Sequence, residues 1–169
     1  NAYVKAGGTL SHAEWRRRNV DLLIRQVYTA IKQADSSVIF GISPQARMDN
    51  NYNCQFIDVK GWINRSGYID YICPQIYFGF QNQTVPYASS LAEWDAMTGN
   101  SGVQLYVGLA VYKCGAIDQW AGAGQNEWVN ENDLLRRMVS SARDSAKYGG
   151  FALYRYDSLF RPESGAKKR

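Results

Sequence analysis

Histidine is nearly missing from this 169-residue chain, whose single copy, His12, stands at the start of a predicted helix. This scarcity disfavours a catalytic triad built on histidine and a zinc site with histidine ligands. Cysteine is also scarce, since the three copies form no CxxC pair and their odd number implies no closed disulfide framework. We therefore predict neither a metal site nor a cofactor.

The three cysteines differ in their predicted surroundings. Cys73 lies inside an apolar run and is expected to be a small buried hydrophobe. Cys54 and Cys114 fall in or beside loops that follow predicted strands. A disulfide between these two remains an open alternative, because the sequence does not give their separation in space.

The sequence has no run of about 18 apolar residues, so no membrane-spanning helix is expected, and it shows no signal peptide. It begins with Asn1 rather than Met, as expected where an upstream segment has been removed or left out. The modest net charge of +4 comes mostly from Lys167, Lys168 and Arg169. We predict a disordered basic tail over residues 161–169 and no nucleic-acid partner.

Aromatic side chains are abundant, at 14% of the residues, with 12 Tyr and 5 Trp. Tyrosine and tryptophan favour surfaces that are partly wet, such as sugar or peptide clefts. The alternative is that these rings simply pack between helices and a sheet.

Four apolar runs, VIFGISP, IDYICPQIYF, VQLYVGLAVYK and GFALYRYD, are separated by segments of helical length. Runs that are apolar on both faces are typical of parallel strands covered by helices. We predict strands over residues 38–42, 69–78, 103–112 and 150–157. Each run turns polar or aromatic at its carboxyl end, where ligands bind in parallel α/β proteins.

The predicted helices cover residues 12–34, 56–65, 87–97 and 131–148. Ser11 and Glu14 form a capping box at the start of the first helix, which has a predicted buried stripe of apolar residues. The stripe consists of Val20, Leu23, Ile24, Val27 and Ile31. Residues 113–130 are predicted to form a long loop, of the kind that is often functional.

These elements predict an α/β fold in one domain of residues 1–160, with parallel strands that alternate with helices. The strand starts lie roughly 30 to 50 residues apart, and a (β/α)8 TIM barrel of about 250 residues has about 31 residues per unit. The spacing fits such a barrel, but the chain supplies four strands where eight are needed.

Five ordered blocks resemble the glycoside-hydrolase-like family 10, a group of bacterial cell-envelope proteins with a (β/α)8 barrel. The blocks are WRRRNVDLLIRQVYTAIK, FGISP, DYICPQIYF, LYVGLAVYK and GFALYRYDSLF. The resemblance implies the C-terminal half of the barrel, from its fourth helix through strands five to eight. It also implies a cell-wall or other polysaccharide glycan as substrate, and a location in the cell envelope or outside the cell. After FGISP the chain departs from the family, because QARM replaces an aromatic, glycine-rich stretch.

Glycoside hydrolysis normally uses two carboxylates. Asp157 is the only acid at the predicted strand ends, and the neighbouring Arg155 favours its ionised form, which suits binding or a base. We predict Asp157 as catalytic, with Arg155 and Tyr156 beside it as substrate-binding residues. The alternative is a purely structural ion pair or turn. The family's other acidic motif would precede Asn1, so this chain alone is expected to bind weakly and catalyse poorly.

Five further residues are predicted to bind substrate: Ser43, Gln75, Tyr77, Lys113 and Trp120. Gln75 and Tyr77 alternate along one strand and are expected to point to the same side, towards sugar hydroxyls or into a polar plug. Lys113 would hold a carboxylate or an N-acetyl oxygen, or else be solvated. Ser43 would bind or merely form a turn, and Trp120 would stack on a sugar or pack beneath its loop.

Two functions follow from these residues. The first is a glycoside-hydrolase-like domain that acts on a glycan, and the second is a non-catalytic carbohydrate-binding or scaffold domain. An unrelated α/β protein with an open sheet is a third interpretation. Four strands leave two unpaired sheet edges, so we expect a homodimer or a separate half-barrel to complete the fold.

Overall fold

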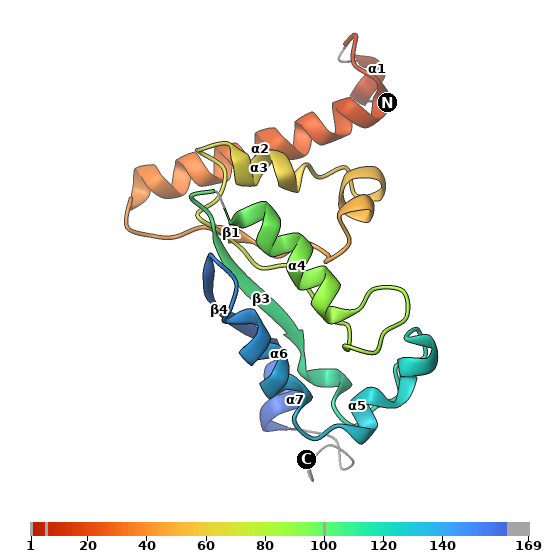
Figure 1. Ribbon diagram of the computed structural model, residues 1–169. Helices are drawn as coiled ribbons and strands as arrows, with labels where there is room; N and C mark the ends of the chain where they lie inside the picture. Colours follow the sequence, from red (N-terminus) through yellow and green to blue (C-terminus); the bar gives the residue numbers. More distant parts are fainter. Residues whose placement is uncertain (1, 6, 100, 162–169) are drawn as a thin grey trace.

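The computed structural model describes residues 2–5, 7–99 and 101–161 and contains a four-stranded parallel sheet with helices between its strands (Figure 1). The strands are β1 (Gly41–Ile42), β2 (Tyr71–Ile72), β3 (Gln104–Ala110) and β4 (Tyr148–Tyr154). The longer helices are α2 (His12–Ala34), α3 (Val59–Asn64), α4 (Tyr87–Thr98) and α6 (Leu134–Ala142). Short helical segments are α1 (Ala2–Lys5), η1 (Asn50–Cys54), η2 (Val111–Lys113), η3 (Gly122–Asn126), α5 (Glu127–Asn130) and α7 (Tyr156–Phe160).

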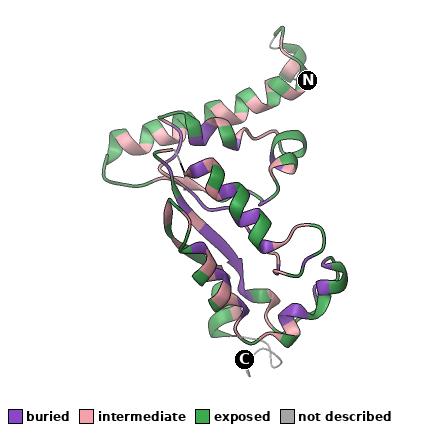
Figure 2. Cartoon of the chain, viewed as in Figure 1, coloured by how far each residue is buried: buried purple, intermediate pink, exposed green. Residues whose placement is uncertain are grey.

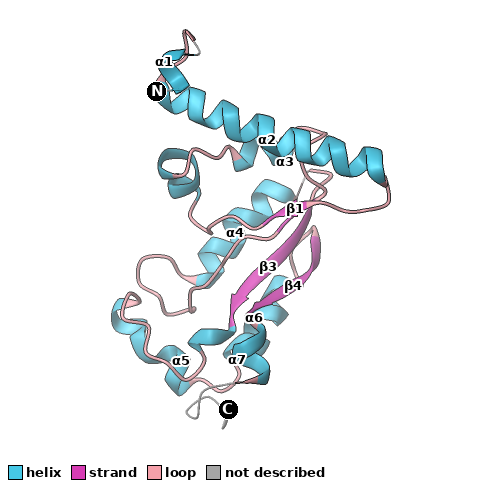
Figure 3. Cartoon of the chain, turned by 180° about the vertical axis from the view of Figure 1, so that it is seen from behind, coloured by secondary structure: helices cyan, strands magenta, loops and turns pink. Residues whose placement is uncertain are grey.

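The strands lie in the order β1-β2-β3-β4, and all neighbours are parallel. This confirms the predicted α/β class. In doubly wound folds the strand order reverses within the sheet. Here the order follows the sequence from one edge to the other, so the arrangement is that of part of a TIM barrel. Helices α4 and α6 cover one face, and the view from behind shows the strands on the side away from them (Figure 3).

The core lies between the sheet and helices α3, α4 and α6. Leu105, Val107 and Leu109 of β3 are completely buried and alternate along the strand, so they share the face that meets the helices (Figure 2). Trp62 of α3 and Trp94 of α4 are almost completely buried against them. Burial of such large side chains is the main stabilising contribution to this layer.

Helix α2 begins with the predicted capping box. The Ser11 hydroxyl accepts from the Glu14 N–H, and the Glu14 carboxylate accepts from the Ser11 N–H. The predicted stripe is only partly buried: Val20 and Ile24 pack against the core, but no α2 residue is fully buried and Leu23 is 58% exposed. The helix also lies against α3, where Trp62 Nε1 donates to Asp21 Oδ1 at 2.6 Å.

The strands are shorter than predicted, for identifiable reasons. Ile39 is 62% exposed on the edge of the sheet, where no preceding strand pairs with it, so β1 begins only at Gly41. Pro74 has no N–H and ends the regular ladder of β2, after which Gln75 forms single bridges to Gln45 and Gly108. Residues 111–112 and 156–157, which were predicted as strand, lie instead in the helical turns η2 and α7.

Two predicted helices are also shorter. Helix α3 begins after Asp58, whose side chain accepts from the Gly61 N–H, and α6 ends at Ala142 before a turn. The predicted long loop contains η2, η3 and α5. Of the predicted tail, residues 162–169 lie outside the described part of the chain. Among the described residues, no helix is long and apolar enough to span a membrane.

Candidate functional site

Three tyrosines meet at the carboxyl ends of three consecutive strands. Tyr77 follows β2, Tyr112 lies in η2 after β3, and Tyr154 ends β4. The ring of Tyr77 stacks on Tyr154 at 5.9 Å between centroids, and the Tyr112 ring meets the other two edge-on at 6.0 and 6.1 Å. We call Tyr77, Tyr112 and Tyr154 the tyrosine cluster; only Tyr77 was predicted as a site residue.

Burial raises the pKa of two phenols of the cluster. Burial, together with the nearby Cys73 and the other two tyrosines, raises the pKa of Tyr77 to about 12. Burial also raises the pKa of Tyr112, with a further contribution from Asp118. None of the three hydroxyls has a hydrogen-bond partner within the described residues. The cluster therefore offers neutral hydroxyl groups that can donate to or accept from a ligand.

Helix α7 carries the predicted catalytic residue and packs against η2, next to the tyrosine cluster. Asp157 lies in the first turn of α7 rather than at a strand end, because β4 stops at Tyr154. Its carboxylate is 3.9 Å from Arg155 Nε, and both side chains are exposed. Tyr156 is also exposed, and its ring contacts Phe160 at 4.7 Å.

The Lys113 ammonium makes hydrogen bonds within the protein, in contrast to the alternative of a solvated lysine. Its ammonium donates to the Tyr77 carbonyl at 2.8 Å and to Asp118 Oδ2 at 2.7 Å. The Asp118 side chain is 2% exposed, and the Lys113 ammonium is its charged partner in this buried position. The sequence analysis missed Asp118; the only signal was an acid in the same loop, five residues after Lys113.

Ser43 and Gln75 join the ends of β1 and β2. Gln75 Nε2 donates to the Ser43 carbonyl at 3.0 Å, while the Ser43 side chain is exposed. Gln75 thus reaches towards β1, whereas the ring of Tyr77 reaches towards β4. The two side chains therefore reach towards opposite edges of the sheet.

Trp120 is 87% exposed, so the alternative that it packs beneath its loop was wrong. The residue that fills that position is Trp128, which is 2% exposed and belongs to the core. Beside it, the buried carboxylate of Glu127 accepts from the N–H groups of Phe80 and Gln81 at 3.1 and 2.9 Å. Glu127 was not singled out from the sequence.

The cysteines are free, so the alternative of a Cys54–Cys114 disulfide was wrong. Cys73 is 8% exposed, as predicted for a buried hydrophobe. Among the described residues, no group of three or more His, Cys, Asp and Glu side chains is placed to hold a metal ion.

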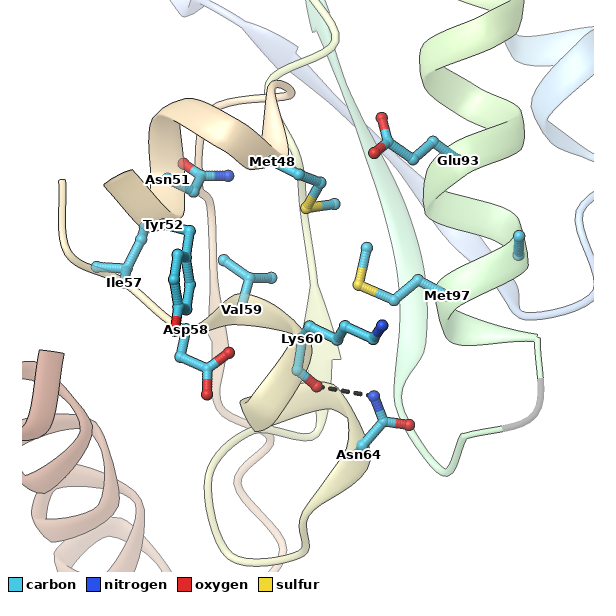
Figure 4. Close-up of a pocket in the computed structure, with 11 residues that line it drawn as sticks. Met48, Asn51, Tyr52, Ile57, Asp58, Val59, Lys60, Asn64, Glu93 and Met97 are labelled. Carbon is cyan, nitrogen blue, oxygen red and sulfur yellow. Dashed lines mark hydrogen bonds between the residues drawn. The ribbon is translucent and has the colours of Figure 1, made fainter. Parts of the chain in front are cut away.

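A pocket of about 620 Å³ lies away from the strand ends, between η1, α3 and α4 (Figure 4). Met48 and Met97 face each other across it, with Val59 below and Lys60 and Glu93 at the rim. It contains none of the predicted site residues. The only polar side-chain atoms buried without a partner in the described chain are Asn51 Oδ1, at this pocket, and Trp128 Nε1.

The fold and its aromatic strand-end face define a section of a (β/α)8 barrel, an architecture that hosts many enzymes at this face. The chain belongs to the Glycosyl hydrolase-like 10 family, whose sequence model matches residues 3–130. It is 28% identical over 179 residues to glycosyl hydrolase DigH of Escherichia coli strain K12, covering 96% of this chain and 40% of DigH. It is 32% identical over 140 residues to glycosyl hydrolase YngK of Bacillus subtilis strain 168, covering 74% of this chain and 27% of YngK. The chain therefore spans less than half the length of these relatives.

Proposed function

We propose that the strand-end face of this glycoside-hydrolase-like domain binds a bacterial cell-wall or other polysaccharide glycan at the cell envelope. The observation that carries the proposal is the tyrosine cluster, in which rings from three strands gather at the end of the sheet where barrel enzymes bind ligands. Tyrosine combines an apolar face with a polar hydroxyl, and a sugar ring presents the same two kinds of surface. Family membership supports the same class of ligand.

Asp157 is the proposed catalytic carboxylate of the complete enzyme. It is exposed and lies on α7, which packs against the η2 turn that carries Tyr112. An ionised Asp157 beside Arg155 suits a nucleophile or base, and a second carboxylate would act as the general acid. Asp118 is paired with Lys113, and Glu127 accepts hydrogen bonds from two backbone N–H groups. Both acids are therefore poor candidates for the general acid.

The hydrolase proposal is tested on the whole polypeptide that carries this chain, with bacterial cell-wall glycan strands as substrate. Asp157→Asn is expected to lower the release of reducing ends at least 100-fold, and Asp144→Asn to leave it within twofold. Asp144 is the matched control, since it is an exposed aspartate in the turn before β4, at the opposite end of the sheet. Equal rates for the two variants would remove Asp157 from the mechanism.

Non-catalytic carbohydrate binding is the second candidate. It is favoured by the finding that the other two acids near this face, Asp118 and Glu127, are buried in structural contacts. Glycan binding that is the same in wild type and Asp157→Asn, with no cleavage by either, would favour this function.

A further inference from the structure

The two loops that follow β2 and β3 are joined to each other by hydrogen bonds. The Glu127 carboxylate binds the N–H groups of Phe80 and Gln81, and the Gln83 N–H donates to the Ala121 carbonyl at 3.2 Å. Gly124 lies so close to the Gln81 carbonyl that a β-carbon there would clash. The two loops therefore form one unit at the edge of the proposed glycan face.

Asp118 holds the second of these loops from within. Besides its ion pair with Lys113, its Oδ1 accepts from the Trp120 N–H at 3.4 Å, and its own carbonyl accepts from the Ala121 N–H at 3.0 Å. Its N–H donates to the Gln125 carbonyl at 2.9 Å, which closes the loop. The backbone on both sides of Trp120 is thus fixed through one buried residue.

Trp120 itself projects from this unit with 87% of its surface exposed. Exposure of an indole to water is unfavourable, and the fixed backbone on both sides of Trp120 keeps the residue at the surface. An indole has only two side-chain torsions to fix, so it loses little conformational entropy on binding. Its flat apolar surface fits the face of a pyranose whose hydroxyls are all equatorial, because that face presents only C–H groups.

We propose that Trp120 is a preformed stacking platform for a pyranose ring, and that Asp118 is the positioning residue that holds it there. This inference rests on the proposed glycan-binding function and names the side chain on which one sugar ring of the ligand stacks. Trp120 extends the binding face from the tyrosine cluster to the loop between β3 and α6.

The test uses the whole polypeptide labelled with 5-fluorotryptophan and titrated with a β-1,4-linked N-acetylglucosamine hexasaccharide. Fluorine spectra of Trp120→Phe identify the Trp120 signal, which should shift on binding. Calorimetry should show about tenfold weaker binding for Trp120→Ala and partial recovery for Trp120→Phe.

Asp118→Asn and Lys113→Met break the ion pair from either side, so both should broaden or shift the Trp120 signal before sugar is added. Asp133→Asn is the control, because Asp133 pairs with Arg136 and Arg137 on α6, outside the loop. If Asp118 is only structural, its variant will lower the melting temperature and leave the Trp120 signal in place, which overturns the positioning role. Unchanged hexasaccharide affinity in Trp120→Ala overturns the platform while glycan binding stands. No binding of any glycan overturns both proposals.

Discussion

The Tyr77 ring stacks on the Tyr154 ring at an interplanar angle of 24°, although the two follow strands that are not neighbours in the sheet. Strand β3 lies between them and contributes Tyr112, whose ring stands nearly perpendicular to both, at 82° and 86°. This contact joins the ends of β2, β3 and β4 in one surface. The glycan proposal and the pKa of Tyr77 both depend on it.

Tyr77 should resist ionisation. Because its pKa is raised to about 12 in the folded protein, against 10.0 for a free tyrosine, it should remain protonated at pH 11. Tyrosine Cζ signals in labelled protein should show several late-titrating phenols, since burial also raises the pKa of Tyr87 and Tyr112, and one of these signals should be missing from Tyr77→Phe. A raised folded pKa means that stability falls as pH rises from 10 towards 12, and this fall should be shallower in Tyr77→Phe. A Tyr77 signal that titrates near pH 10 contradicts the packing of the cluster.

Asp70 should stabilise the amino end of the sheet. Burial favours its neutral form, but hydrogen bonds from Lys32, the Phe40 N–H and Tyr28 outweigh burial and lower its pKa. Asp70→Asn should therefore reduce the free energy of unfolding at pH 7 by about 1–2 kcal/mol. The difference from wild type should shrink as pH falls below 3.8, through the lowered pKa of Asp70.

Urea unfolding at pH 7 and at pH 3 measures this effect. Asp133→Asn provides the control, since its more exposed ion pairs should contribute less than about 1 kcal/mol. The same loss for Asp70→Asn at both pH values would show that the charge of Asp70 has no part in the effect.

Much of the fold could be predicted, because the signals were local. The capping box at Ser11 and the length of the four apolar runs gave the helix start and the order of the strands. The strand ends could not be predicted in the same way. The loss of pairing at Ile39 depends on its place at a sheet edge, and the helical turn at Asp157 depends on where β4 stops.

The site was harder to predict than the fold. Tyr112 and Tyr154 look like ordinary strand residues in the sequence, and only the sheet brings them to Tyr77. The roles of Asp118 and Glu127 arise from contacts between loops, which composition and spacing do not encode. Trp120 and Trp128 occupy the same predicted loop, but the structure buries one and exposes the other.

Glu127 should keep the loop after β2 in place. Glu127→Gln substitutes an amide N–H₂ for one acceptor oxygen, so either the Phe80 or the Gln81 N–H loses its partner. We expect the unfolding free energy to fall by about 1–3 kcal/mol. Amide hydrogen exchange should accelerate at Phe80 and Gln81 more than in β3. Unchanged exchange at these two amides would contradict the role of Glu127.

The open sheet edges should make the isolated 169-residue chain associate. Ile39 beside β1 is 62% exposed and Phe151 in β4 is 43% exposed, and the open edges of the sheet invite pairing. Light scattering should give a mass of at least two chains, and Ile39→Lys with Phe151→Lys should lower it. Ile117→Lys is the control, since Ile117 is 59% exposed but lies in a loop. A clean monomer at every concentration, with no partner segment bound, would contradict the expectation.

The most direct test of the central claim is a titration of the tyrosine-labelled polypeptide with the β-1,4-linked N-acetylglucosamine hexasaccharide, followed by NMR. The account predicts that the signals of Tyr77, Tyr112 and Tyr154 shift together with one dissociation constant, while Tyr52, at the pocket between η1, α3 and α4, does not move. Shifts at Tyr52 alone, or no shift of any tyrosine at saturating sugar, would contradict a glycan site at the strand ends.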